Sequence, residues 1–299
     1  VIDPARFHEQ QFMLFALAWL FRATRDPAVL ALAEATFAED PLAASLERGD
    51  GVVPQSGPNA GKQNQYMHLF EALLDIHEAT QDPVWLDRAR PVLRLLRQRL
   101  IDDAGSIRAF ARSEGPDAIW REPGHHFRWV WLLHRFSLLT DDWSFLPEVQ
   151  RIFAFADRFG VARSGALATT VHDAVSVDGA ILAGSRLLWA QTEHVKALAA
   201  VACIEGSTTR WEEVEASIEA IERLYLRPDR VTFYNQLGPH ARPLNPVLSW
   251  RNQRGVDLSL PLLMPARLLY HLTLMAVEVG KLRALLGGRT GLGEAGRKD

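Results

Sequence analysis

The sequence is poor in the residues that mark several large classes of protein. Among its 299 residues there is one cysteine, Cys203, so neither an intrachain disulfide framework nor a thiolate metal cluster can form. The net charge of -3 provides no basic surface for a nucleic-acid backbone. We therefore expect no nucleic-acid partner, a reducing cytoplasmic location, and Cys203 as a small buried apolar residue.

Long apolar segments are also missing. The two longest are residues 12–21, about half of a membrane span, and residues 261–277, which Pro265, Arg267 and His271 interrupt. No basic segment followed by an apolar stretch and a cleavage site opens the chain. We expect no membrane partner and no secretory signal. Because the chain begins at "VIDPARF" without methionine, we also expect that an N-terminal portion precedes it.

Apolar side chains, by contrast, make up 48% of the sequence and are arranged in a repeat. Three segments each consist of a strongly apolar helix, a short Thr-x-Asp turn and a more polar second helix. The turns recur at Asp26, Asp82 and Asp142. In the first two, the aspartate is followed by Pro27 or Pro83, which predicts a capping aspartate with proline at the first helical position.

A fourth, weaker pair of helices has Gly206 near the end of its first helix, and one more apolar helix is predicted over about 262–280. The first helix of each pair is apolar nearly all round and the second is amphipathic, which predicts an inner and an outer layer. The pattern indicates an all-α toroid of helix hairpins. We expect a single barrel domain over residues 1–283 and a flexible, glycine-rich tail over residues 284–299.

The segments between the pairs are long and contain short β-like pieces, at residues 105–112, 165–174 and 230–237. Loops of that length in a compact domain are usually functional. Turns within the pairs are short, so the long connections should gather at the end of the toroid where the inner helices begin. The site is expected there.

Polar side chains recur at the start of the inner helices. Three of these helices each carry a histidine near the same end, which suits proton transfer at carbon because imidazole takes and gives a proton near neutral pH. A single such histidine would more simply be a hydrogen-bonded, half-buried ring. Zinc is the competing interpretation, but no His-x-x-x-His or His-Glu-x-x-His pair occurs. The candidates are Asn64, His68, Glu71, His125, Arg128, Trp189, Gln191, Glu193, Arg267 and His271.

Four motifs, in order, resemble the N-acylglucosamine 2-epimerase family, which includes mannose and sulfoquinovose isomerases, cellobiose 2-epimerases and renin-binding proteins. They are "NQYMHLFEALLDIHEATQDP", "EPGHHFRWVWLL", "LWAQTEHVKA" and "MPARLLYHL". The resemblance implies an (α/α)6 barrel that interconverts sugars at C1 and C2. It also implies that His125 and His271 are the acid/base pair and that Asn64, His68, Trp189 and Glu193 line the pocket.

The chemistry implied by the resemblance needs no metal and no cofactor. One imidazole removes the C2 hydrogen of an open-chain aldose to give a cis-enediol, and the proton's return to C1 gives a ketose. Neighbouring donors such as Asn64 and His68 would stabilise the enediolate oxygen. We expect aldose–ketose isomerisation of a mannose-like sugar, with 2-epimerisation of N-acylglucosamine or a related sugar as the alternative. Assembly as a homodimer stays open.

Arg128 stands where the family carries glutamate, three residues after the first histidine. Arg128 and Arg267 share helix faces with His125 and His271, so they are candidates to bind an anionic substituent such as a phosphate or sulfonate. In the simpler interpretation, Arg128 pairs with a carboxylate, Glu122 or Glu193, or extends outward. A catalytically silent, sugar-binding relative is a further alternative that Arg128 favours.

A glycoside hydrolase of the same architecture would need two opposed carboxylates. Two adjacent pairs, Asp102-Asp103 and Asp141-Asp142, stand in turns, where solvated or capping roles are usual. Glu122 and Glu193 are better candidates for such a reaction, but it would leave the histidines unexplained.

Overall fold

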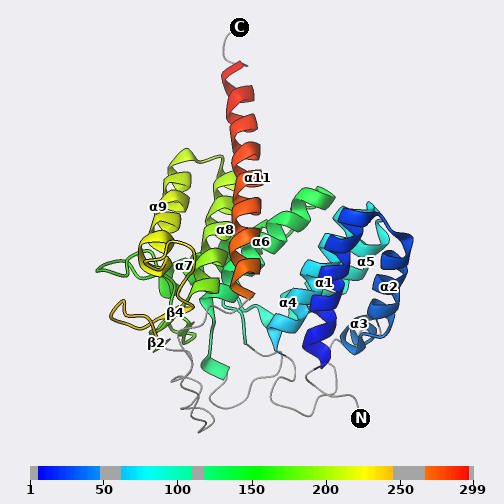
Figure 1. Cartoon of the computed structure of the whole chain (residues 1–299), viewed down its shortest axis with the longest axis horizontal. Helices are drawn as coiled ribbons and strands as arrows, with labels where there is room; N and C mark the ends of the chain where they lie inside the picture. The colour runs from blue at the N-terminus through cyan, green and yellow to red at the C-terminus, as the bar shows by residue number, and fades with distance from the viewer. Residues whose placement is uncertain (1–5, 48–61, 110–117, 245–266, 296–299) are drawn as a thin grey trace. The chain divides into compact units, whose positions relative to one another are not determined.

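The computed structural model describes residues 6–47, 62–109, 118–244 and 267–295 (Figure 1). Contacts divide the chain into two compact units. Unit 1 comprises Val1–Asp103 and Ile107–Trp120, and unit 2 comprises Ala104–Ser106 and Arg121–Asp299. Helices dominate both units, and in the described residues the named strands, each of two or three residues, all fall in unit 2.

Unit 1 is built around α4, which is buried on almost every side and packs against α1 and α5. A π-helical turn, η1, extends α5. The second helix, α2, contacts both α1 and the short α3. The bounds are α1 (Arg6–Thr24), α2 (Pro27–Ala38), α3 (Pro41–Glu47), α4 (Gln63–Thr80), α5 (Val84–Leu95) and η1 (Leu96–Leu100).

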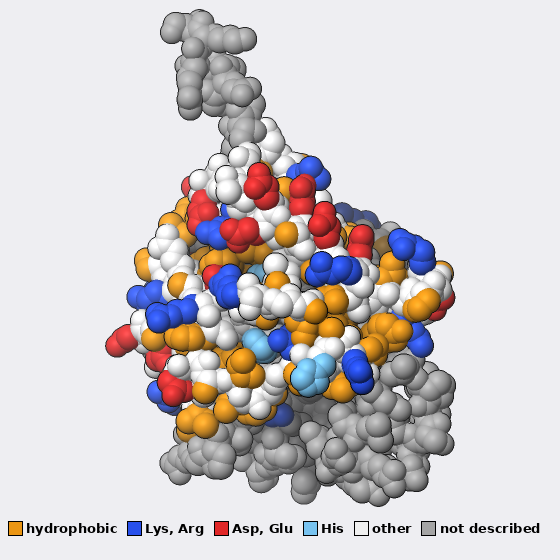
Figure 2. All heavy atoms as spheres, turned by 90° about the vertical axis from the view of Figure 1, so that its left-hand side faces the viewer, with side chains coloured by type: hydrophobic (Ala, Val, Ile, Leu, Met, Phe, Trp, Pro, Cys, Tyr) orange, Lys and Arg blue, Asp and Glu red, His pale blue; other side chains and the backbone are white. Residues whose placement is uncertain are grey.

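Unit 2 is built around α8, which contacts α6, α9 and α11. The inner helices α6 and α8 are buried nearly all round, whereas α7 and α9 bury one face each. Figure 2 shows acidic side chains gathered over the upper part of the face where α9 lies, as expected for an outer helix. The bounds are α6 (Pro123–Thr140), α7 (Leu146–Gly160), α8 (Leu188–Glu205), α9 (Thr208–Tyr225) and α11 (Arg267–Ala295).

The strands of unit 2 form two small antiparallel pairs. β1 (Ala174–Val175) pairs with β2 (Ile181–Ala183), and β3 (Arg186–Leu187) pairs with β4 (Gln236–Leu237). β3 runs directly into α8, so its pairing with β4 fixes the point at which that inner helix begins. The expected β-like pieces at 165–174 and 230–237 are confirmed in these pairs and in bridges at Val171 and Phe233. In the piece expected at 105–112, Ile107 forms a bridge with Ile101, and residues 110–112 lie outside the described residues.

The Thr-x-Asp turns that join the helices of each hairpin share one geometry. The middle residue, Arg25, Gln81 or Asp141, has a left-handed φ of 56°, 61° or 55°. Each preceding threonine accepts a hydrogen bond from the aspartate N–H, at 3.2–3.3 Å. Each aspartate in turn accepts from the N–H two residues on, as expected for a helix cap. The predicted cap is confirmed for Asp26, which is the N-cap of α2 with Pro27 at the first helical position. In the second hairpin Pro83 is itself the N-cap of α5, so Asp82 binds the turn just before that helix.

The fourth hairpin closes differently, as its sequence indicates. Gly206 ends α8 with φ 62°, and the side chain of Ser207 accepts from the Arg210 N–H at the start of α9. Cys203 is buried on α8, and its thiol donates to the Leu282 carbonyl. In the described residues no helix has the length and apolarity to cross a bilayer.

Two elements differ from the sequence-based expectation. The helix α3 was not expected. It begins at Pro41, and the side chain of the preceding Asp40 accepts a hydrogen bond from the Leu42 N–H. The last helix continues to Ala295 instead of ending near residue 280. Helix growth is cooperative, since each added residue closes one more hydrogen bond. The expected tail boundary at residue 283 therefore falls inside α11, and the single barrel domain over 1–283 stays a prediction.

Candidate functional site

The motif "EPGHH" begins α6, and its proline and glycine allow two close helix contacts. Pro123 stands at the first turn, where its missing N–H costs nothing, and it packs on Gly160, whose added Cβ would lie 2.4 Å from the proline Cβ. A Cβ on Gly124 would lie 2.8 Å from Ala190 and from the Trp189 ring. Glycine therefore lets the start of α6 close onto the start of α8.

Three aromatic rings from three helices lie against one another, tilted, in unit 2. The His125 ring of α6 lies 4.9 Å from the Trp189 ring of α8, tilted by 36°. On α11, the His271 ring lies 6.1 Å from the same indole, tilted by 37°. Trp189 thus contacts both histidines. Their side chains are 13% and 12% exposed, so both imidazoles reach solvent.

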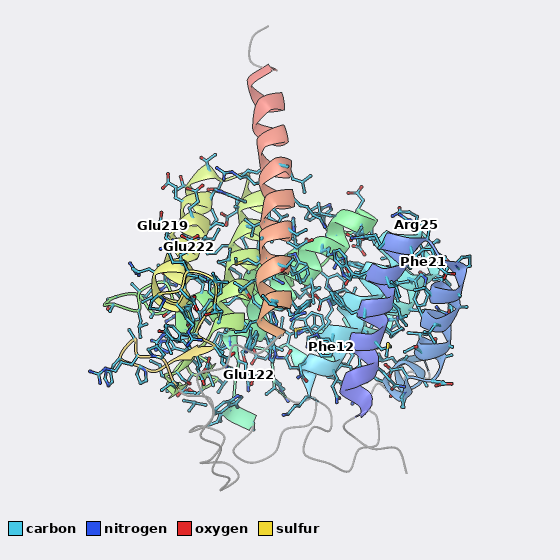
Figure 3. All side chains as sticks on the ribbon, in the orientation of Figure 1. Phe12, Phe21, Arg25, Glu122, Glu219 and Glu222 are labelled. Carbon is cyan, nitrogen blue, oxygen red and sulfur yellow. The ribbon has the colours of Figure 1, made fainter. Side chains whose placement is uncertain are left out.

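Each of these histidines has a carboxylate partner. Nδ1 of His125 lies 2.5 Å from Oε2 of Glu122, three residues earlier on the chain, a contact that is an ion pair when the imidazole is protonated. Glu122 is labelled in Figure 3, near the end of unit 2 where α11 begins. Nδ1 of His271 lies 3.1 Å from Oε1 of Glu193. An ionised carboxylate only accepts hydrogen bonds, so His271 carries its proton on Nδ1 and leaves Nε2 available.

Glu193 is the centre of a buried charge cluster. Its side chain is fully buried, and Lys196 Nζ lies 2.8 Å from its Oε2. Arg128 Nη1 lies 3.7 Å from Oε1, and the same guanidinium donates through Nη2 to the Tyr270 hydroxyl. Burial opposes ionisation of Glu193, but Lys196, Arg128 and His271 outweigh it and lower the pKa of the carboxyl to about 2. The carboxylate is therefore ionised at neutral pH.

The same cluster acts on His271. Burial lowers the pKa of its imidazole, Glu193 partly restores it, and Arg128 and Lys196 lower it further. The net direction is downward, which keeps the ring neutral near pH 7 and ready to accept a proton on Nε2. Within the described chain, no group of three histidine, cysteine, aspartate or glutamate side chains is arranged to hold a metal ion.

The structure therefore brings five of the ten candidates together within unit 2: His125, Arg128, Trp189, Glu193 and His271. Arg128 is 1% exposed and faces Glu193 and Tyr270, which matches the interpretation in which it pairs with a carboxylate. Arg267 is the first residue of α11, and its side chain lies outside the described residues.

Asn64 and His68 belong to unit 1, where they lie near the start of α4. Nδ1 of His68 lies 3.6 Å from Oε2 of the buried Glu71, and its ring contacts Phe12. The buried Oδ1 of Asn64 has no hydrogen-bond partner among the described residues, so it has acceptor capacity to spare. Their part in a sugar pocket stays a prediction.

Sequence reasoning missed two members of the cluster, Lys196 and Tyr270. The role of Lys196 could have been predicted, because it follows Glu193 by three residues on the predicted helix and side chains at that spacing face each other. Tyr270 precedes His271 in the closing motif, but its contact with Arg128 joins α11 to α6 and has no local signal.

The carboxylates of the glycoside hydrolase alternative have other roles. Asp141 has a left-handed φ in a hairpin turn, and Asp142 accepts a hydrogen bond from the Ser144 N–H in the same turn. Asp103 stands exposed in the turn after η1. Glu193 has no exposed side-chain surface and contacts two cations. Glu122, the other better candidate, is accessible and lies against His125, but Glu193 is enclosed, so these two do not form an opposed pair of accessible carboxylates.

Comparison with known proteins defines the class. The family model for N-acylglucosamine 2-epimerase (GlcNAc 2-epimerase) matches residues 2–252, so the chain belongs to this family. Its fold is all-α and is that of the (α/α)6 barrel structures that it resembles. The likeness to a crystal structure of D-mannose isomerase has a TM-score of 0.68 at 18% identity, over 79% of this chain and 65% of that chain. For cellobiose 2-epimerase from Bacillus thermoamylovorans B4167 the TM-score is 0.67 at 15% identity, over 80% and 65%.

Among curated proteins, the chain is similar to a mannose-6-phosphate isomerase of Rhizobium meliloti (strain 1021). The two are 29% identical over 156 residues, which are 49% of this chain and 39% of the relative. The chain thus matches less than half of this relative's length and slightly less than two thirds of the two solved chains.

Proposed function

We propose that the protein isomerises a mannose-like aldose and the corresponding ketose through a cis-enediol. The observation that carries the proposal is the pair of imidazoles, His125 and His271, that contact one indole from two different helices. Family membership and the similarity to a mannose-6-phosphate isomerase support the substrate class.

In this proposal His271 is the base, because its Nδ1–H is held by Glu193 and its pKa is lowered. Its Nε2 takes the C2 proton, the C–H electron pair forms the C1–C2 double bond, and His125 gives a proton to the carbonyl oxygen O1. The protonated His271 then returns its proton to C1 while His125 takes the proton of the C2 hydroxyl, which gives the ketose and restores both imidazoles. Return of the proton to the opposite face of C2 would give the epimer instead.

Trp189 serves as the aromatic wall between the two imidazoles, where a sugar face would stack. The Arg128 guanidinium faces Glu193 and Tyr270. If the preferred substrate is an acidic sugar, Arg267 is therefore the main candidate to bind its anionic group. As the family resemblance implies, Asn64 and His68 are further proposed sugar-binding residues.

The test is proton NMR of mannose, mannose 6-phosphate and N-acetylglucosamine incubated with the protein in deuterated water. Loss of the C2–H signal reports the enediol whichever product forms, and the product then distinguishes isomerisation from epimerisation. His125→Ala and His271→Ala should each slow exchange by roughly 10² to 10⁴, whereas the exposed His240→Ala should not. Sugar binding without exchange would indicate the silent relative, and sugar release from glycosides would indicate a hydrolase.

A further inference from the structure

Glu193 has no side-chain surface left for a sugar hydroxyl. Its exposed fraction is 0%, Oε2 faces Lys196 at 2.8 Å, and Oε1 faces His271 at 3.1 Å. Arg128 approaches Oε1 as well, at 3.7 Å. A carboxylate enclosed in this way can act on a substrate only through one of its three partners, and of these His271 is the one that reaches solvent.

The two carboxylate oxygens of Glu193 contact different partners. Oε1 accepts a hydrogen bond from the imidazole of His271, and Oε2 forms an ion pair with the ammonium of Lys196. Lys196 is itself 0% exposed and lies on the same helix as Glu193, one turn later. Its Nζ lies 3.8 Å from the centre of the Trp131 ring, so an aromatic face supports the charge on the side away from water.

A buried carboxylate without a counter-charge would take up a proton and lose its strength as an acceptor. Lys196 is the partner in shortest contact with Glu193, and it is held by helix geometry as well as by the indole. Arg128 is farther away and also serves Tyr270. The ammonium therefore has the position needed to keep Glu193 anionic.

We propose that Lys196 is a positioning residue for His271 that acts through Glu193: its buried ammonium holds the carboxylate, and the carboxylate holds the imidazole with Nε2 free. This inference rests on the proposed function for its catalytic meaning, and it assigns Glu193 to orienting the base instead of contacting the sugar.

The groups facing His271 in the described structure set the expected direction of each substitution. They are Glu193 and Lys196 from α8, Arg128 from α6, and Tyr270 on its own helix. Glu193 raises the imidazole pKa, whereas Arg128 and Lys196 lower it. Lys196→Met should therefore raise the pKa of His271, and Glu193→Gln should lower it. A role in packing alone would not produce opposite shifts from neighbouring substitutions.

The experiment measures the pKa of His271 directly, by NMR of histidine-labelled protein, in the wild type, Lys196→Met and Glu193→Gln. Lys281→Met is the matched control, because Lys281 also pairs with a glutamate three residues away, at 2.7 Å, but is 48% exposed. We expect the two opposite shifts and no shift in the control. If the pKa of His271 were the same in Lys196→Met as in the wild type, the inference would be overturned.

Deuterium exchange at C2 is measured in parallel. Lys196→Met should lower kcat by roughly 10²-fold, the effect of a misplaced catalytic group, with little change in KM. The double variant Lys196→Met/Glu193→Gln removes both charges of the pair, so it also covers the case in which Lys196→Met does not fold. Because Lys196 acts through Glu193, the double variant should be no slower than Glu193→Gln alone; additive losses would contradict the inference.

The two readouts separate this inference from the proposed function. Opposite pKa shifts in a protein that exchanges no sugar would refute the isomerase but keep the coupling of Lys196 to the imidazole. Exchange in the wild type with no pKa shift in Lys196→Met would keep the isomerase and refute the positioning role.

Discussion

The backbone of Gly124 and the indole of Trp189 are in direct contact: a methyl group on Gly124 would lie 2.8 Å from two ring carbons. This contact fixes the ring that lies against both His125 and His271. The glycine that interrupts the start of α6 is therefore required by the site and not by the backbone conformation of the helix.

Gly124→Ala should displace the indole, since real Cβ contacts do not occur at that distance and overpacking of a closed contact costs about 1–3 kcal/mol. We expect a lower free energy of unfolding by that amount in urea denaturation, together with slower deuterium exchange at C2.

Gly280→Ala on α11 is the control, because an added Cβ there meets no atom within 4 Å. Alanine in place of glycine inside a helix should stabilise by roughly 0.5–1 kcal/mol. If Gly124→Ala behaved like Gly280→Ala in both stability and exchange, the close contact with Trp189 would have no functional part.

Arg128 distinguishes two interpretations of the cluster. If its guanidinium serves Glu193 and Tyr270, Arg128→Met should lower the free energy of unfolding by about 3 kcal/mol, as for a broken buried ion pair. The ratio of mannose to mannose 6-phosphate turnover should then stay unchanged. Arg223→Met, at an exposed position of α9, should change stability by less than about 0.5 kcal/mol. A shift of turnover toward the neutral sugar in Arg128→Met would instead indicate that Arg128 binds an anionic substituent.

The helix hairpins could be predicted because their signals are local. A threonine, one left-handed residue and an aspartate that accepts from the N–H two residues on lie within three positions, so local hydrogen bonds define the turn. At Asp40-Pro41 the aspartate that caps α3 is followed by proline but lacks the preceding threonine and left-handed residue, so α3 had a weaker local signal. The continuation of α11 to Ala295 could not be predicted, because the glycines and charged residues in that stretch are also typical of a flexible tail.

The candidate site was predictable in its residues but not in its connections. His125, Trp189 and His271 stand near the starts of apolar helices, where polar rings are unusual enough to notice. That Arg128 would face Glu193 depends on how α6 packs against α8, which periodicity does not reveal. The sequence was compatible with both interpretations of Arg128, pairing with a carboxylate or binding an anionic substituent, and only the packing distinguishes them.

The hairpin turns supply a prediction about stability. Asp82 accepts from the Val84 N–H at 3.0 Å, so Asp82→Ala should lower the free energy of unfolding by about 1 kcal/mol. Gln81 has φ 61°, so Gln81→Gly should raise it or leave it unchanged, since glycine adopts this conformation without a steric cost. Urea denaturation of the two variants checks both signs. Equal losses in the two variants would show that the turn geometry contributes little.

Two buried histidines outside the site, His172 and His194, predict how stability depends on pH. Burial, reinforced by Arg186, lowers the pKa of His172 to about 4. Burial also lowers the pKa of His194 to about 4, with Asp157 opposing and Arg163 adding to the effect. In the unfolded chain both should titrate near the ordinary value of about 6.5. Between these values the unfolded state binds more protons than the folded state.

The free energy of unfolding should therefore be fully retained above about pH 6.5 and fall as the pH decreases toward about 4, by at most roughly 1.4 kcal/mol per pH unit for each histidine. The double variant His172→Gln/His194→Gln should have a flatter pH dependence over this window, even though its stability at pH 7 is lower. His240→Gln, at an exposed position, should retain the wild-type slope. Urea denaturation across the window gives the slopes, and a wild-type slope in the double variant would mean that these rings are not held neutral by burial.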